Sequence, residues 1–189
     1  DRAFTVATST SPVVRFARTQ LAPRLVPLVL RLNAGRAYGF RTVSQLAIRY
    51  RRSPLSVEGP DAARHGPRAG DRLPDAPVTQ NGRAVTLHRA LVASGFHLLL
   101  CGSTAFRPPA AAAQLADRYA GLVTVHHLTS NVGPGTLHDD TGAALRRLGV
   151  DDNRPAHVLV RPDGYIGFRG GADLSGVRVY LARMIIGVP

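Results

Sequence analysis

The sequence predicts an α/β domain built on a mixed sheet, and two observations carry that prediction. The first is a β-hairpin at 156–169, where two apolar strands meet at Pro162-Asp163-Gly164. Proline presets φ there, and glycine can adopt the positive φ that the turn requires. The second is the alternation of strand-like and helix-like apolar patterns around the hairpin. In chain order we expect a strand at Phe96–Cys101, a helix around Pro109–Ala120, a strand at Leu122–Leu128, a helix around His138–Leu148, the hairpin, and a helix around Leu174–Ile186.

This order of strands and helices is typical of a thioredoxin-like domain. Such a domain normally has a Cys-x-x-Cys pair just after its first core strand, and here that place reads Cys101-Gly102-Ser103-Thr104. Because Cys101 is the only cysteine in the chain, dithiol chemistry is impossible. Pro155 takes the position at which this fold places a cis-proline, and we expect a structural role for it.

The residues before the core strand predict a second, smaller hairpin and a boundary. The hairpin turn is expected at Gln80–Arg83, followed by a strand at Val85–Leu87 and a helix-like stretch at His88–Ser94. From Ser53 to Leu73 the chain is rich in proline and glycine, which favours a linker or an extended segment and places the domain boundary there. The second unit is expected to start near Gly70-Asp71.

The leading segment predicts one helix and one strand. Apolar residues recur at helical spacing from Ser11 to Leu32, with Thr10 or Ser11 as the N-cap and Pro12 in the first turn. We interpret this as a docking helix, because its apolar face needs a partner larger than the helix itself. The residues of that face are Val14, Leu21, Leu25, Leu28 and Leu32. A strand is expected over Val43–Tyr50, where Leu46, Ile48 and Tyr50 alternate.

Composition limits the partners that the chain can have. Its formal net charge is +12, and all 24 basic residues are arginine. Residues 1–60 hold ten arginines against Asp1 and Glu58, a net of +8, whereas residues 61–189 hold fourteen against ten aspartates, a net of +4. Aromatic residues make up only 6% and do not interleave with arginine, so no nucleic-acid partner is expected.

A membrane role is not expected either. The apolar stretch at 13–32 is long enough to raise the question, but four arginines interrupt it and two prolines would disturb it. A lone cysteine fits a reducing compartment, so the expected location is the cytoplasm.

Three motifs together resemble the C-terminal end of the FAD-dependent aromatic hydroxylases, which act on phenols and aromatic polyketides. They are the segments Gln45–Leu55 (QLAIRYRRSPL), Gly66–Pro77 (GPRAGDRLPDAP) and Leu159–Tyr165 (LVRPDGY). Each motif is weak alone, but their order and spacing match the family. The resemblance implies an N-terminal FAD-binding part, a middle part for the aromatic substrate, and a C-terminal thioredoxin-like domain without redox cysteines.

On this resemblance the chain corresponds to the end of such an enzyme. It begins at Asp1 and has no G-x-G-x-x-G fingerprint after a strand, so we expect a fragment of a longer protein. Residues 1–60 are expected to be the tail of the FAD and substrate part, and residues 66–189 the thioredoxin-like domain. The resemblance implies that the parent uses FAD, NAD(P)H and O₂ to hydroxylate an aromatic substrate. No residue of the chain matches a catalytic, cofactor-binding or metal position of the family, so the fragment is expected to be inactive and to bind no FAD.

Other candidate sites in the sequence are weaker. His126-His127 with His138-Asp139-Asp140 has a metal-like composition, but adjacent residues on a strand point to opposite faces, so His126 and His127 cannot share one ion. Gly133–Thr136 resembles a phosphate loop, yet no lysine follows, and we expect a turn before the helix at His138.

Two alternatives to the hydroxylase hypothesis stay open at this point. The first is a single-cysteine redox protein of the thioredoxin or peroxiredoxin type, which would depend on Cys101; a buried thiol would argue against it. The second is a basic interaction module that binds an acidic partner through residues 1–60. On the hydroxylase hypothesis, the apolar face of the leading helix has lost its partner in the fragment, so we expect it to be covered by a second copy of the chain or by folding back on the thioredoxin-like domain, and we favour the homo-oligomer.

Overall fold

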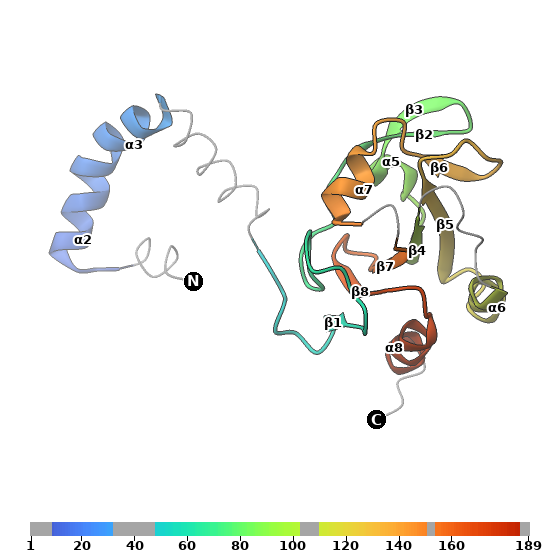
Figure 1. Ribbon diagram of the computed structural model, residues 1–189. Helices are drawn as coiled ribbons and strands as arrows, with labels where there is room; N and C mark the ends of the chain where they lie inside the picture. Colours follow the sequence, from blue (N-terminus) through green and yellow to red (C-terminus); the bar gives the residue numbers. More distant parts are fainter. Residues whose placement is uncertain (1–8, 32–47, 103–109, 151–153, 186–189) are drawn as a thin grey trace. The chain divides into compact units, whose positions relative to one another are not determined.

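The computed structural model describes residues 9–31, 48–102, 110–150 and 154–185 (Figure 1). By compactness the chain divides into two units, Asp1–Ile48 and Arg49–Pro189. The first contains one continuous helical stretch, formed by α2 (Pro12–Phe16), a π-helical turn η1 (Ala17–Leu21) and α3 (Ala22–Arg31). Ser11 takes the N-cap position without a side-chain hydrogen bond, and proline stands in the first turn as expected.

The second unit is organised around one sheet of eight strands in the order β1-β8-β7-β4-β5-β6-β2-β3 (Figure 1). Three neighbouring pairs are parallel (β1 with β8, β4 with β5, and β5 with β6), and the remaining pairs are antiparallel. The strands are β1 (Val57–Glu58), β2 (Pro77–Gln80), β3 (Arg83–Thr86), β4 (Phe96–Cys101), β5 (Val123–Thr129), β6 (Thr136–His138), β7 (Ala156–Val160) and β8 (Ile166–Gly170). The sheet is therefore mixed, as the sequence predicts.

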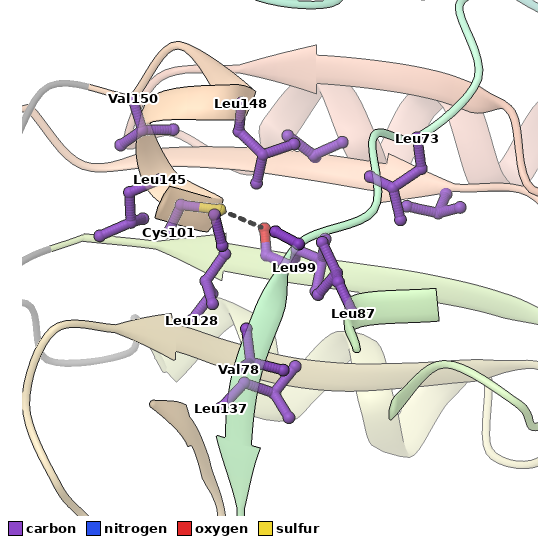
Figure 2. Packing of buried hydrophobic residues seen from close by; sticks show 14 of the residues in the cluster. Leu73, Val78, Leu87, Leu99, Cys101, Leu128, Leu137, Leu145, Leu148 and Val150 are labelled. Atoms are coloured by element: carbon purple, nitrogen blue, oxygen red, sulfur yellow. Dashed lines mark hydrogen bonds between the residues drawn. The ribbon is translucent and has the colours of Figure 1, made fainter. Parts of the chain in front are cut away.

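Helices cover both faces of this sheet. The helices are α5 (Leu87–Ala90), α6 (Ala110–Arg118), α7 (Ala143–Leu148) and α8 (Ser175–Ile185). Alternation along β4 sends Leu99 and Cys101 into a cluster with α5 and α7, shown in Figure 2, and Leu98 and Leu100 into a second cluster with α6 and α8. A bulge between β7 and β8 pairs Val160 with Ile166 but Leu159 with Phe168.

The two predicted hairpins are confirmed. Gly164 adopts φ +80° in the turn between β7 and β8. Asn81 and Gly82 adopt φ +50° and +75° between β2 and β3, the two positive values that a type I′ turn requires. The strand at β4, the helix at α6, the strand at β5 and the final helix also lie where the sequence predicts them.

Two expectations for the second unit need correction. The helix predicted at 138–148 begins only at Ala143, because Thr136–His138 pairs with β5 and β2 as strand β6 and Gly142 then adopts φ +66°. The turn at Gly133–Thr136 therefore precedes a strand, and the Thr136 hydroxyl donates to the Gly133 carbonyl at 2.7 Å. No cis peptide bond occurs in the described ranges, so the Arg154–Pro155 bond is trans.

Of the two alternatives expected for Ser53–Leu73, a linker or an extended segment, the structure shows the second, because this segment packs on the domain. Strand β1 extends the sheet beside β8, and Ala69 and Leu73 are each only 3% exposed. By compactness the chain divides between Ile48 and Arg49. The division between 60 and 66 that the resemblance implies stays a prediction. Of the strand predicted at 43–50, residues 43–47 lie outside the described residues, and 48–50 have no strand conformation.

Candidate functional site

Cys101, the one candidate nucleophile in the sequence, is sealed inside the core. It ends strand β4 with no exposed surface, and Leu128, Leu145 and Leu148 lie in the same cluster (Figure 2). Its Sγ lies 3.9 Å from the Leu99 carbonyl oxygen, a weak donor contact. Burial raises the pKa of the Cys101 thiol to about 12, so a thiolate does not form at neutral pH. The cysteine behaves as a small apolar core residue.

The histidine and aspartate cluster suspected from the sequence does not assemble. His126 and His127 point to opposite faces of the sheet, since they pair with Leu99 and Leu100 of β4. His138 contacts Asp140 through Nδ1 at 2.5 Å, and its Nε2 lies 2.9 Å from the Ser130 carbonyl oxygen. Asp139 is buried and accepts a hydrogen bond from the Leu145 N–H at 2.8 Å, near the start of α7. In the described ranges no three side chains of His, Cys, Asp or Glu gather as a metal site.

One histidine that sequence reasoning missed is His97, a lone polar residue in the apolar strand β4. It is 3% exposed, and its Nδ1 lies 3.0 Å from His126 Nε2. Its other ring nitrogen, Nε2, lies 2.9 Å from the Ala93 carbonyl oxygen. The sequence did contain a signal for this contact, because His97 is a polar residue inside an apolar strand and a buried polar group needs a hydrogen-bond partner.

A buried arginine organises the segment that precedes the sheet. Arg169 of β8 is 5% exposed, and its Nε donates to Glu58 Oε2 at 2.9 Å. Its terminal nitrogens donate to the carbonyls of Ala63 and Pro67, which lie in the stretch predicted as a linker. Glu58, the only glutamate in the chain, also accepts from the Ala69 N–H through Oε1 at 2.7 Å. We call residues 49–72 the strap, since they are bound to the sheet through these contacts.

A second ion pair holds the beginning of the strap. Arg51 donates to both carboxylate oxygens of Asp71, at 2.7 and 2.6 Å, and Asp71 Oδ2 accepts from the Arg68 N–H at 2.8 Å. Burial alone raises the pKa of Asp71, but the hydrogen bonds from Arg51 and Arg68 outweigh it and keep that pKa below its usual value. The bidentate geometry fixes Arg51 where the chain enters the second unit.

Two surface clefts lie at different places on the domain. One, of about 430 Å³, is lined by parts of α5 and the tip of the β7–β8 hairpin, with Arg161 and His97 among its residues. The other, of about 600 Å³, lies between the strap and the start of β7, with Arg64, Arg154 and Pro155 among its residues. Arg161 is already paired with Asp163.

The starts of helices α7 and α8 each have a glycine, but neither leaves room there for the pyrophosphate of a flavin dinucleotide. Such a cofactor needs glycines that leave room for the pyrophosphate at a helix N-terminus. Helix α7 follows Gly142, where a Cβ would lie 2.9 Å from Arg146 Nη1. Helix α8 contains Gly176 in its first turn, where a Cβ would lie 2.5 Å from the Phe168 ring. Both glycine faces are filled by the domain's own side chains. In the described residues no helix is both long and apolar enough to span a membrane.

The family model for the C-terminal region of aromatic-ring hydroxylases matches residues 66–187. The chain belongs to this family. The match covers the whole sheet except β1, together with α5, α6, α7 and α8. The resemblance found in the three sequence motifs is thereby confirmed. The described part of this aromatic-ring hydroxylase domain contains no redox cysteine pair.

Solved structures of a flavin-dependent monooxygenase and of a hydroxylase share the fold. The flavin-dependent monooxygenase PieE, solved with FAD and substrate, aligns with a TM-score of 0.55 and 22% identity over 96% of this chain and 31% of its own. The anhydrotetracycline hydroxylase OxyS from Streptomyces rimosus aligns with a TM-score of 0.52 and 23% identity, over 92% of this chain and 30% of its own. The chain therefore spans less than a third of the length of these enzymes.

The thioredoxin-like architecture also has matches outside the flavin enzymes. A thiol peroxidase from Chromobacterium violaceum aligns with a TM-score of 0.53 and 13% identity, over 65% of this chain and 90% of its own. At such identity the likeness concerns the fold alone. No curated protein matches the chain.

Proposed function

We propose that this chain is the C-terminal part of an FAD-dependent aromatic monooxygenase, and that its thioredoxin-like domain takes no part in the chemistry. The observation that carries the proposal is the sealed position of Cys101 in a domain that belongs to the aromatic-ring hydroxylase family. In a redox domain of this fold a reactive thiol would lie near the end of that strand and be open to solvent. Here the thiol is packed among leucines, so the fold is used without its redox chemistry.

The catalytic parts of the parent enzyme are assigned to the remainder of the polypeptide. FAD, reduced by NADH or NADPH, would supply the oxygen-transfer chemistry there. The aromatic substrate would bind in that part too. The residues of this chain serve packing and subunit contact: the strap joins the domain to what precedes it, and the helix at 12–31 presents an apolar face for docking.

Exposed apolar side chains of the helical stretch 12–31 support a docking role. Four large apolar side chains of the helical stretch are strongly exposed: Val13, Phe16, Leu21 and Leu25. Arginines lie between them, and no acidic residue occurs from residue 9 to residue 31. Exposed apolar faces of this kind mark contacts with another protein surface. In the parent we assign this contact to the FAD and substrate part or to a second subunit.

Two titrations of the purified chain test the proposal. FAD added in increasing amounts should show no stoichiometric binding and no shift in the flavin absorbance. Ellman's reagent should not react with Cys101 in the native protein, whereas the denatured protein should release one thiol equivalent. The denatured sample is the control for the thiol. Tight FAD binding would contradict the non-catalytic role, and a thiol that reacts at once in the native state would favour a redox protein.

A further inference from the structure

Sheet geometry brings together two histidines that are 29 residues apart in the sequence. In the parallel pair β4–β5, His97 lies opposite Thr124, and His126 lies opposite Leu99. Residues two apart on a strand share a face, so both imidazoles project from the same side of the sheet. Their ring centroids are 5.2 Å apart with planes inclined by 37°, and His97 Nδ1 lies 3.0 Å from His126 Nε2. The two ring nitrogens therefore face each other at hydrogen-bond distance.

The tautomer of His97 follows from its other contact. Its Nε2 lies 2.9 Å from the Ala93 carbonyl oxygen, which can only accept a hydrogen bond. Nε2 therefore carries the proton, and Nδ1 presents its lone pair towards His126. A ring N–H donated to a backbone carbonyl is the usual way in which a protein orients a histidine that ligates a metal.

His126 is able to join as a second ligand. Its ring is only partly buried. Without an ion, His126 Nε2–H donates to His97 Nδ1. His126 Nδ1 makes no hydrogen bond with any described residue, so on binding an ion the ring can take its proton on Nδ1 and free the Nε2 lone pair.

We propose that His97 Nδ1 and His126 Nε2 form a bidentate site for a divalent transition-metal ion, with Cu²⁺ preferred to Zn²⁺. Nitrogens 3.0 Å apart, each about 2.0 Å from an ion, subtend an angle of about 97°. That angle is closer to the right angle of tetragonal Cu²⁺ than to the tetrahedral angle of Zn²⁺. Within the described ranges no third His, Cys, Asp or Glu joins the pair, so water completes the coordination.

The chain offers a matched control for this site. His127 is adjacent to His126 in sequence, but it pairs with Leu100 and so projects from the opposite face of β5. The variants His126→Gln and His127→Gln each remove one imidazole from strand β5, at neighbouring positions but on opposite faces of the sheet. His126→Gln still carries an amide that can donate a hydrogen bond to His97 Nδ1, which protects the fold.

The test is a Cu²⁺ titration of the full chain at neutral pH, with glycine as a competing chelator, followed by electron paramagnetic resonance. We expect one equivalent bound with two nitrogen ligands in the wild type and in His127→Gln, loss of that equivalent in His126→Gln, and weaker binding of Zn²⁺. Equal binding by His126→Gln and the wild type would overturn the site. Equal loss in both variants would overturn it as well. Either result would leave the two histidines as a hydrogen-bonded pair.

A second measurement keeps the proposal falsifiable if His126→Gln does not fold. Diethyl pyrocarbonate modifies accessible imidazoles, and mass spectrometry locates the modified residue. One equivalent of Cu²⁺ should slow the modification of His126 in the wild-type chain and leave that of His127 unchanged. Unchanged modification of His126, or equal protection of both residues, would refute the site.

Discussion

Substitution of Glu58 by glutamine tests whether the strap is an integral part of the domain. The change keeps the shape of the side chain but removes the carboxylate that faces Arg169 Nε at 2.9 Å. The Arg169 side chain is 6% exposed, so its charge would stay buried without an anionic partner. Breaking a fully buried pair in this way costs about 3–5 kcal/mol.

The expected magnitude for Glu58→Gln is smaller than that, because Glu58 is itself 42% exposed and water partly replaces it. A hydrogen bond to a charged group contributes about 1.5–3 kcal/mol. We therefore expect a loss of about 2–3 kcal/mol in the free energy of unfolding. For a domain of this size the melting temperature should fall by about 5–10 °C.

The assay is urea denaturation with circular dichroism, and Asp61→Asn is the matched control. Asp61 belongs to the same strap, is exposed and has φ +57°, a conformation that asparagine tolerates. The control loses the same charge but no described ion pair. If Glu58→Gln and Asp61→Asn lower the stability equally, Glu58 does not anchor the strap and the reasoning is refuted. A chain that begins at Gly66 should lose more stability than Glu58→Gln, because it lacks both Glu58 and Arg51.

Three further outcomes are expected. Burial lowers the pKa of His126 to about 4 and also lowers that of His157, so the fold favours their neutral forms. Above about pH 6.5 both side chains are neutral in the folded and the unfolded chain, so they do not change the free energy of unfolding with pH. As the pH falls towards 4, these histidines take up protons more readily in the unfolded chain than in the folded one, so the free energy of unfolding declines. Urea denaturation should show His126 alone accounting for about 2–3 kcal/mol of that decline, and a stability independent of pH between 7 and 4.5 would contradict this. Gly164→Val should destabilise the domain by about 1–3 kcal/mol, because valine is strained at the φ of +80° that Gly164 adopts. No atom lies within 4 Å of the new Cβ, so backbone strain and not a steric clash is the cause. An unchanged melting temperature would show that the turn tolerates a β-branched residue. In sedimentation the chain should self-associate at high micromolar concentration through its exposed helix, and Leu25→Glu should reduce the association; a monomeric wild type with an intact helix would rule this out.

Elements encoded by a few neighbouring residues were predictable. The two hairpins depend on turns at Asn81-Gly82 and Pro162-Asp163-Gly164, in which the residue types themselves allow the positive φ that is needed. The strand β4 and the helix α8 follow from runs of apolar residues at their own spacing. In contrast, the helix expected from His138 was too long, because the pairing of Thr136–His138 with two other strands overrode its local propensity.

For the candidate site, too, some features could be predicted from the sequence and others could not. The lack of a dithiol is evident from the single cysteine, and the family resemblance is visible in three motifs. The burial of Cys101 was one of two outcomes that the sequence allowed, and the packing of α7 against β4 decided it. The contact of His97 could not be predicted from the sequence, because its partner His126 lies on a neighbouring strand, 29 residues further along the chain.

By itself the sequence determined the two hairpins, the strands β4 and β5, the helices α6 and α8, the absence of dithiol chemistry and the family. Only the tertiary structure decided that the proline-rich stretch predicted as a linker belongs to the strap, since its anchor Arg169 lies 111 residues after Glu58. Only the tertiary structure paired His97 with His126 across two strands. The physical reason is the range of the forces involved. Backbone conformation is set by sterics within about four residues, whereas burial, ion pairs and strand neighbours depend on which distant segments the fold brings into contact.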